Sequence, residues 1–339
     1  MRLKQQLYGF FAAVGILVLI FDGQTALEGA RQGIDLCTRI VIPSLFPFFL
    51  LSCILTSALF GTSFPPLRLL GRLCHVPPGS ESLLIPGFLG GYPVGAQTVS
   101  NAYHSGQLTK YQANRLLSFC SNAGPAFLFG MVSAYFPGIA YPFLLWLIQL
   151  ISAVAVSIIL PFRRESDIQH VHTPAFSLSD MMKLKLIAMA TVCGWVVTFR
   201  ILICFLDKWC LWMLPKEINT VISGILELTN GCTQLDQIEH IGLRFIVCSG
   251  IVSFGGLCVT LQTASVIGTL SLKSYFSGKL LQTIISIILS FLFQMTFSQE
   301  KRVPGAMPIA AVCIESLSVF LLFRMKMRKN SSNPAALGV

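Results

Sequence analysis

A short polar run occurs twice in this chain, each time inside an apolar stretch. One copy reads GGYPVGAQTVS over residues 90–100 and the other reads GGLCVTLQTAS over 255–265, and six of the eleven positions agree without a gap. Amide and hydroxyl side chains can hydrogen-bond a polar solute, and paired glycines let a backbone leave the helical path. Repeated interruptions of apolar segments are typical of secondary transporters, although two glycine-rich helices can also match by chance. The solute-binding candidates are Gln97, Thr98, Gln262 and Thr263, and the backbone and gating candidates are Gly90, Gly91, Pro93, Gly95, Gly255 and Gly256.

Two further apolar segments are interrupted by polar residues, at 121–125 and at 227–231. Non-helical backbone at membrane depth survives only where protein or water covers it, so these residues should lie in the interior. Broken helices expose N–H ends that attract anions and carbonyls that attract cations. The alternative is that each polar side chain only holds helices together. The additional binding candidates are Ser121, Asn122, Glu227, Thr229 and Asn230, and the additional gating candidates are Gly124 and Pro125.

Ionisable residues within apolar segments are functional candidates, because a charge at the centre of a bilayer costs about 3 kcal/mol even on lenient scales. Four such residues occur, namely Arg200, Glu227, Arg244 and Glu315. Arg200 and Arg244 lie near the ends of their segments and can also reach the interface. Glu315 lies near the middle of the last apolar segment, where it could pair with Arg200 or carry a coupling proton or ion. The coupling candidates are therefore Arg200 and Glu315.

The composition identifies the class of protein. Charged residues are 11% of the 339 and apolar residues 54%, with a mean hydropathy of +0.73, which predicts an all-α polytopic membrane protein. The net charge of +10 indicates cytoplasmic loops, and no nucleic-acid partner is expected. The eleven cysteines are scattered, so we expect no metal site and no disulfide framework. Nucleotide-binding and hydrolase motifs are missing, so we expect neither a cofactor nor an enzyme.

The segments that position these residues form two related halves. We expect about eight to ten membrane segments with broken or re-entrant helices, divided into an N-terminal half (1–161), a cytoplasmic loop (162–180) and a C-terminal half (181–339). An amphipathic stretch over 25–39 favours a solvated or interfacial face. Plain spans are expected over 7–21 (an uncleaved first helix rather than a signal peptide), 40–60, 139–161, 181–206, 280–297 and 306–323, and the interrupted segments over 82–103, 110–136, 217–230 and 241–268.

The distribution of lysine and arginine predicts the orientation. It places the N-terminus, the 62–80 loop, the 161–180 loop and the C-terminus in the cytoplasm. The spans agree with this placement only if one segment in each half enters the membrane and returns on the same side. The halves would then be inverted relative to each other.

The interrupted segments also resemble a known family. GGYPVGA at 90–96, SNAGPAF at 121–127, ELTNG at 227–231 and FGGL at 254–257 look like the YlbJ-like sporulation integral membrane proteins, which carry the nucleoside-recognition or Gate domain. The resemblance covers about 40–323, so that each half holds one Gate-like repeat. The domain name is shared with concentrative nucleoside transporters and with the pore part of ferrous-iron transporters, whose GTPase part has no counterpart here.

The resemblance implies transport of a small polar or anionic solute in a spore-forming, Gram-positive bacterium, with dipicolinic acid as the implied cargo. It implies the cell membrane, or a membrane around the forespore, as the location. The alternatives are a non-transporting membrane component of a sporulation assembly and a nucleoside-type transporter. The expected partners are the solute and the lipid bilayer, with a second copy of the chain or other sporulation membrane proteins as candidate protein partners.

Overall fold

The computed structural model describes residues 2–59, 65–163 and 178–297, and every regular element in these ranges is a helix. Five helices are long and apolar enough to cross a membrane, which confirms the prediction of an all-α polytopic membrane protein. They cover Gly23–Leu51, Ala140–Ile159, Lys185–Trp209, Ile241–Val266 and Leu272–Thr296. Helix α1 (Arg2–Phe21) has a shorter apolar stretch, Ala12–Phe21, in the part of it that the structure describes in full.

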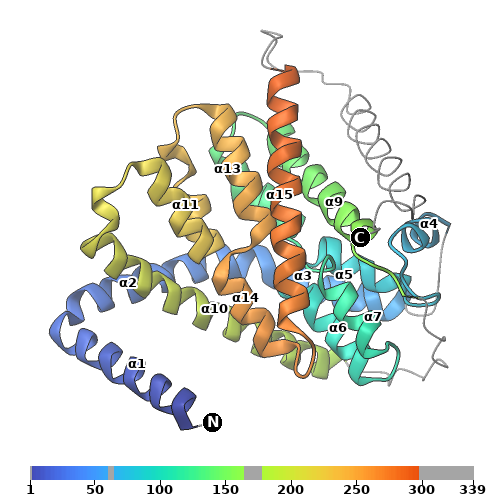
Figure 1. The fold of residues 1–339 in the computed structure, drawn as a ribbon, viewed down its shortest axis with the longest axis horizontal. Helices are drawn as coiled ribbons and strands as arrows, with labels where there is room; N and C mark the ends of the chain where they lie inside the picture. Colours follow the sequence, from blue (N-terminus) through green and yellow to red (C-terminus); the bar gives the residue numbers. More distant parts are fainter. Residues whose placement is uncertain (1, 60–64, 164–177, 298–339) are drawn as a thin grey trace, which may run out of the picture.

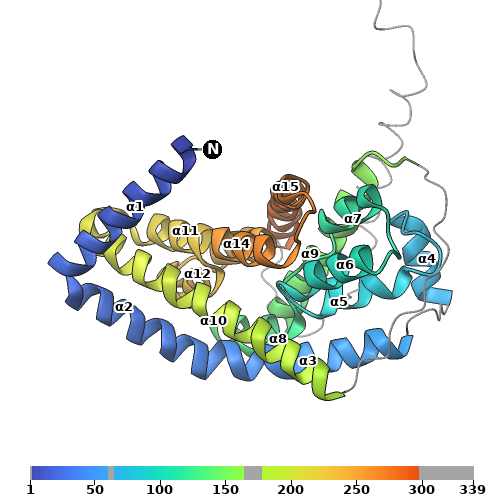
Figure 2. The same ribbon diagram turned by 90° about the horizontal axis from the view of Figure 1, so that it is seen from below.

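Two helices that are long and apolar enough to cross a membrane run side by side beneath the rest of the molecule, and we call them the crossing helices (Figures 1 and 2). The first is α2 (Gly23–Leu36), which continues through a π-helical turn (Cys37–Val41) into α3 (Ile42–Leu59). The second is α10 (Leu178–Trp209), which runs antiparallel to α2, because Lys208 pairs with Asp22 while Gly33 contacts Val197. The amphipathic stretch over 25–39 is the first part of a helix that is long and apolar enough to cross a membrane, and its charged residues Glu28, Arg31, Asp35 and Arg39 are exposed.

Each half contains a tight hairpin of two short helices, α5 (Leu84–Leu89) with α6 (Val94–His104) and α11 (Lys216–Leu226) with α12 (Leu228–Thr233). The two arms touch at glycines. A Cβ on Gly95 would lie 2.9 Å from the Cα of Gly87, and a Cβ on Gly231 would lie 2.2 Å from the Cα of Gly224. Each hairpin therefore closes only because these contacts lack side chains.

Each half also contains a broken helix after its hairpin. Extended residues separate α7 (Lys110–Leu117) from α8 (Pro125–Gly130), and the left-handed Gly255 separates α13 (Ile241–Phe254) from α14 (Gly256–Val266). An arginine in the first part of each broken helix binds backbone carbonyls of neighbouring segments. Arg115 donates to Cys74 and Ser157, and Arg244 donates to Ile238 and Tyr135. The second of these explains why Arg244 is in an apolar segment, namely to hold two loops.

A long helix completes each half, α9 (Ala140–Ile159) in the first and α15 (Leu272–Phe297) in the second, and both pack with α13. Helix α15 is apolar outside and polar inside. Its residues Ile284, Ile288 and Phe291 are exposed, whereas its buried stripe is Lys279, Gln282, Ser286 and Ser290. Each half thus has a crossing helix, a hairpin, a broken helix and a long helix in the same order.

The described chain also contains several shorter elements. These are α4 (Pro65–Leu73), four 3₁₀ turns (Glu81–Leu83, Val132–Tyr135, Leu211–Met213 and Leu235–Gln237) and the π turn named above. Glu315, the expected span over 306–323 and most of the expected 162–180 loop lie outside the described residues.

The two repeated glycine runs occupy different places in this order. Gly90 and Gly91 form the tip of the hairpin in the first half, whereas Gly255 and Gly256 break the helix that follows the hairpin in the second half. Gly91, Gly255 and Gly256 all have φ between +80° and +85°, a conformation that other residues rarely adopt.

Candidate functional site

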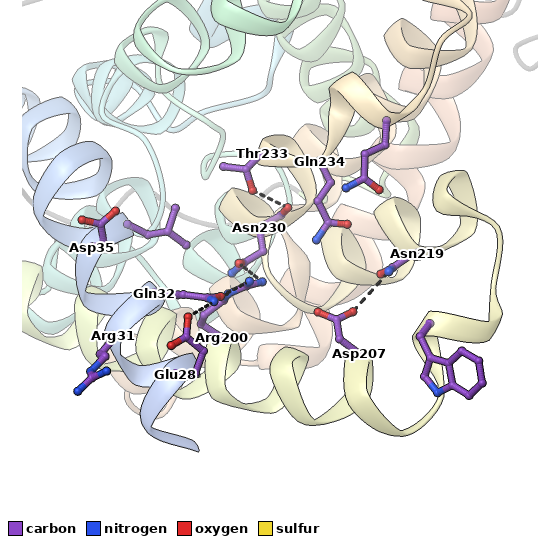
Figure 3. A pocket seen from close by; sticks show the side chains of 13 residues that line it. Glu28, Arg31, Gln32, Asp35, Arg200, Asp207, Asn219, Asn230, Thr233 and Gln234 are labelled. Carbon is purple, nitrogen blue, oxygen red and sulfur yellow. Dashed lines mark hydrogen bonds between the residues drawn. The ribbon is translucent and has the colours of Figure 1, made fainter. Parts of the chain in front are cut away.

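A polar pocket of about 830 Å³ opens between α2, α10, α11 and α12 (Figure 3). Its charged side chains have both signs. Its lining includes the acids Glu28, Asp35 and Asp207, the bases Arg31 and Arg200, and the amides Gln32, Asn219, Asn230, Gln234 and Gln237. A pocket of this size and polarity suits a small polar solute.

Arg200 is the centre of a hydrogen-bond relay that leads inward from this pocket (Figure 3). Its Nε donates to Gln32 Oε1 at 2.9 Å, and its Nη1 donates to Asn230 Oδ1 at 3.0 Å. Asn230 in turn donates its Nδ2 to Glu227 Oε2 at 2.7 Å. Asn230 therefore bridges a guanidinium and a carboxylate that make no direct ion pair.

Glu227 is buried where the hairpin α11–α12 turns. Its carboxylate accepts from the backbone N–H groups of Thr229 at 3.0 Å and Asn230 at 2.7 Å, so it caps the N-terminus of α12. Such a cap satisfies N–H groups that have no partner within the helix. The side chain is only 2% exposed, which places a carboxylate deep in the protein.

A second, much smaller cavity of about 40 Å³ lies where the interruptions of both halves meet. Its polar and glycine residues come from both halves: Tyr92 and Gly124 from the first, and Glu227, Thr229 and Gln262 from the second. The remaining lining is apolar. A cavity of this volume holds about one water molecule, so an organic solute requires the surrounding segments to move apart.

Tyr92 joins the two halves at this point. Its hydroxyl lies 3.2 Å from the carbonyl oxygen of Val252 and 3.3 Å from that of Ser253, in the last turn of α13. A Cβ on Gly255 would lie 3.0 Å from the Tyr92 ring, so the break in α13–α14 leaves the room that this ring occupies. The hairpin of one half is therefore seated against the broken helix of the other.

Lys279 occupies the centre of a buried polar network behind Tyr92. Its Nζ donates to Tyr92 Oη at 3.0 Å, to Asn122 Oδ1 at 3.3 Å and to Gln282 Oε1 at 2.7 Å, and its side chain is fully buried. Gln282 also donates to Asn122 Oδ1 at 2.8 Å. Asn122 donates its own amide to the carbonyls of Gly87 and Phe119. The network thus links α15 with the hairpin and the broken helix of the first half.

The structure distributes the predicted binding residues among these places. Glu227, Thr229 and Gln262 line the small cavity, Asn230 lines the large pocket, and Asn122 lies in the lysine network, with Ser121 and Thr263 buried. The two remaining candidates lie apart. Gln97 accepts a hydrogen bond from Lys185, and Thr98 bonds only the carbonyl of Val94 in its own helix.

Several site residues were not expected from the sequence, namely Lys279, Gln282, Tyr92 and Gln32. Lys279 stands at the edge of an apolar run, where a lysine usually reaches the interface. The signal that distinguishes it is spacing. Lys279, Gln282, Ser286 and Ser290 follow one another at intervals of three, four and four, which puts all of them on one helical face.

These features define the class of protein: an all-helical, multi-pass membrane protein whose two halves meet around a buried polar interior. No family model and no solved structure matches the chain. Among curated proteins it is similar to the sporulation integral membrane protein YlbJ of Bacillus subtilis (strain 168), with 24% identity over an alignment 323 positions long; the match covers 80% of this chain and 78% of the relative. The similarity supports a membrane protein associated with sporulation.

Proposed function

We propose that the chain transports a small polar or anionic solute across the membrane. The observation that carries this proposal is the meeting of both hairpins and both broken helices at one small interior cavity, next to a large polar pocket. Interrupted segments from two repeats that meet in the interior are the arrangement in which secondary transporters bind their substrates. The glycines at the breaks provide the points about which these segments can move.

The side chains that line the small cavity bear on how transport could be coupled to protons. Because the Glu227 carboxylate lines it, an anion that enters meets a like charge unless this carboxyl group is protonated. Transport of an anion would then carry a proton with it. Arg200 and Glu315 remain proposed coupling residues. Arg200 is connected to Glu227 through Asn230.

The resemblance to sporulation membrane proteins supports dipicolinic acid as the first solute to test, in the cell membrane or a membrane around the forespore. We therefore propose measuring uptake of labelled dipicolinate, with a nucleoside as comparison, by liposomes that contain the purified protein. Each solute is measured with and without a proton gradient. Saturable dipicolinate flux that increases with the gradient is the expected result.

The variant Asn122→Leu should abolish this flux, because it removes the amide that joins Lys279 and Gln282. A leucine side chain cannot accept their hydrogen bonds. Gln97→Leu tests the more distant candidate and is also expected to abolish flux. The matched control is Asn101→Leu, the same change at an exposed position of α6. Normal flux in both site variants, at normal insertion levels, would refute this site.

The alternative function is a membrane component of a sporulation assembly that transports nothing. Its supporting observation is the same dense packing at the breaks, which could serve only to hold helices together. It predicts no flux of either solute from folded protein, and loss of partner binding rather than of transport in the variants.

A further inference from the structure

Arg200 carries a positive charge that has no acidic partner among the residues that the structure describes. A guanidinium stays protonated in proteins, so this charge is permanent. Its hydrogen bonds go to two neutral amide oxygens, Gln32 Oε1 and Asn230 Oδ1. The ion pairs found in the described ranges do not include it. A guanidinium that neutral groups hold in place can bind an anion without first giving up an ion pair.

The two amides that hold Arg200 are themselves held by carboxylates. Gln32 donates its Nε2 to Glu28 Oε1 at 2.6 Å, and Asn230 donates its Nδ2 to Glu227 Oε2 at 2.7 Å. Each amide therefore turns its oxygen toward Arg200, because its nitrogen is already engaged. The bonds to Gln32 and Asn230 leave one N–H unused on each Nη of Arg200. Two N–H groups of one guanidinium match the two oxygens of a carboxylate.

Arg200 lies where the large polar pocket adjoins a second pocket of about 660 Å³, and Asp207 also lines both. The charged residues that α2 contributes to the large pocket are exposed, namely Glu28, Arg31 and Asp35. The two that α10 contributes, Arg200 and Asp207, are half-buried. The inner charges of the large pocket are therefore one guanidinium and one carboxylate.

Asp207 faces the same pocket as Arg200 (Figure 3). The two residues are seven positions apart on α10, which is about two turns. They therefore share a face of the helix and start about 10 Å apart along its axis. The carboxylate of Asp207 accepts a long hydrogen bond from Asn219 Nδ2 at 3.4 Å and makes no ion pair within the described ranges. One wall of the pocket thus offers a group that binds anions and, two turns away, a group that binds cations.

We propose that this pocket binds a zwitterionic carboxylate, with its carboxylate group on Arg200 and its cationic group on Asp207. A dianion of the same size would place its second carboxylate against Asp207, in a pocket that Glu28 also lines, and like charges repel. The inference deepens the proposed function, and it rests on that function for the statement that the bound compound is the transported solute. It predicts that a polar solute with both charges binds this pocket more tightly than a dianion such as dipicolinate does.

The test is equilibrium binding by calorimetry to the purified full chain in detergent, with three probes of similar length. The first, 6-aminohexanoate, carries both charges. Adipate replaces its ammonium end by a second carboxylate, and 6-aminohexanamide replaces its carboxylate by a neutral amide. We expect 6-aminohexanoate to bind at least about fivefold more tightly than either of the others, because it alone matches both Arg200 and Asp207.

Asp207→Asn removes the negative charge and keeps an oxygen that can accept from Asn219. It should weaken binding of 6-aminohexanoate and strengthen binding of adipate, by about three- to tenfold each, an opposite pair of changes that a purely structural role would not produce. Arg200→Gln should weaken binding of both carboxylates about tenfold or more. The matched controls are Asp236→Asn and Arg72→Gln, the same changes at exposed positions outside both pockets, and both should bind as the unmodified protein does.

Three results would overturn this site: no binding of 6-aminohexanoate to the unmodified protein, equally tight binding of adipate or 6-aminohexanamide, or an unchanged preference in Asp207→Asn. The last of these decides even if Arg200→Gln fails to fold. These outcomes are separable from the failure of transport. Binding of 6-aminohexanoate without flux of any solute supports the site and refutes the transporter. Dipicolinate flux that Arg200→Gln and Asp207→Asn leave unchanged supports the transporter and refutes this pocket as its solute site.

Discussion

Asn230 shows why an amide, rather than an acid, stands between Arg200 and Glu227. Its oxygen accepts from the guanidinium while its nitrogen donates to the carboxylate, so a single side chain satisfies both charged groups. A carboxylate in this position could accept from Arg200 but could donate nothing to Glu227. The relay therefore depends on the two-sided character of the amide.

We accordingly expect Asn230→Asp to destabilise the protein by about 1–3 kcal/mol near neutral pH, because it removes a donor and places two carboxylates side by side. Thermal unfolding in detergent measures the loss. Asn219→Asp makes the same change next to Asp207 at the half-buried rim of the pocket and should cost less. An equal or larger loss at the rim would contradict the role of Asn230.

The sequence predicted which polar residues lie in the interior better than it predicted the residues that bond them. Glu227, Thr229 and Gln262 line the small cavity, Asn230 lines the large pocket and Asn122 bonds Lys279 in the interior, because a polar residue near a break must be covered by protein. Lys279 was not predicted, since position alone does not tell a buried lysine from one that reaches the interface. Only the helices that pack around Lys279 in the structure distinguish the two cases.

At the scale of elements, the hairpins depend on glycine contacts that no local pattern identifies. The breaks themselves could be predicted from glycine and proline. That Gly231 lies against Gly224, and Gly95 against both Gly87 and the carbonyl oxygen of Cys120, depends on how the arms fold back. The same reason explains why the amphipathic pattern over 25–39 did not reveal its packing partner: Gly29 and Gly33 contact α10, which follows far along the chain.

Gly231→Ala and Gly95→Ala should each cost about 1–3 kcal/mol or prevent folding, because the added Cβ would lie 2.2 Å or less from backbone atoms. Yield and thermal stability after purification are the measurements. Gly194→Ala, in the middle of α10 with nothing within 4 Å, should be neutral or stabilising by up to about 1 kcal/mol. If all three variants behaved alike, the hairpin contacts would not be what holds these arms together.

At the scale of the whole molecule, the order of elements reveals the two halves more clearly than the sequence repeat does. Each half has a crossing helix, a hairpin, a broken helix and a long helix. The matching glycine runs fall in a hairpin in one half and in a broken helix in the other, so local similarity alone does not align the halves. The antiparallel crossing helices are what inverted halves require.

The orientation of the chain stays a prediction, and α10 provides its test. If α10 crosses the membrane, residues before and after it lie on opposite sides. A reporter inserted after Arg163 should be cytoplasmic, and one inserted after Met213 should be outside. Reporters on the same side would show that α10 does not cross and would require a different number of spans.

The bonds between the halves also govern how the chain is made. Gln282 reaches back 160 positions to Asn122, which at about 5–20 residues per second means a wait of roughly 8–30 s after Asn122 leaves the ribosome. Throughout that time the amide of Asn122 and the phenol of Tyr92 lack the partners that α13 and α15 bring. A chain truncated after α9 would keep these groups without those partners, so we expect it to be less stable than the full chain.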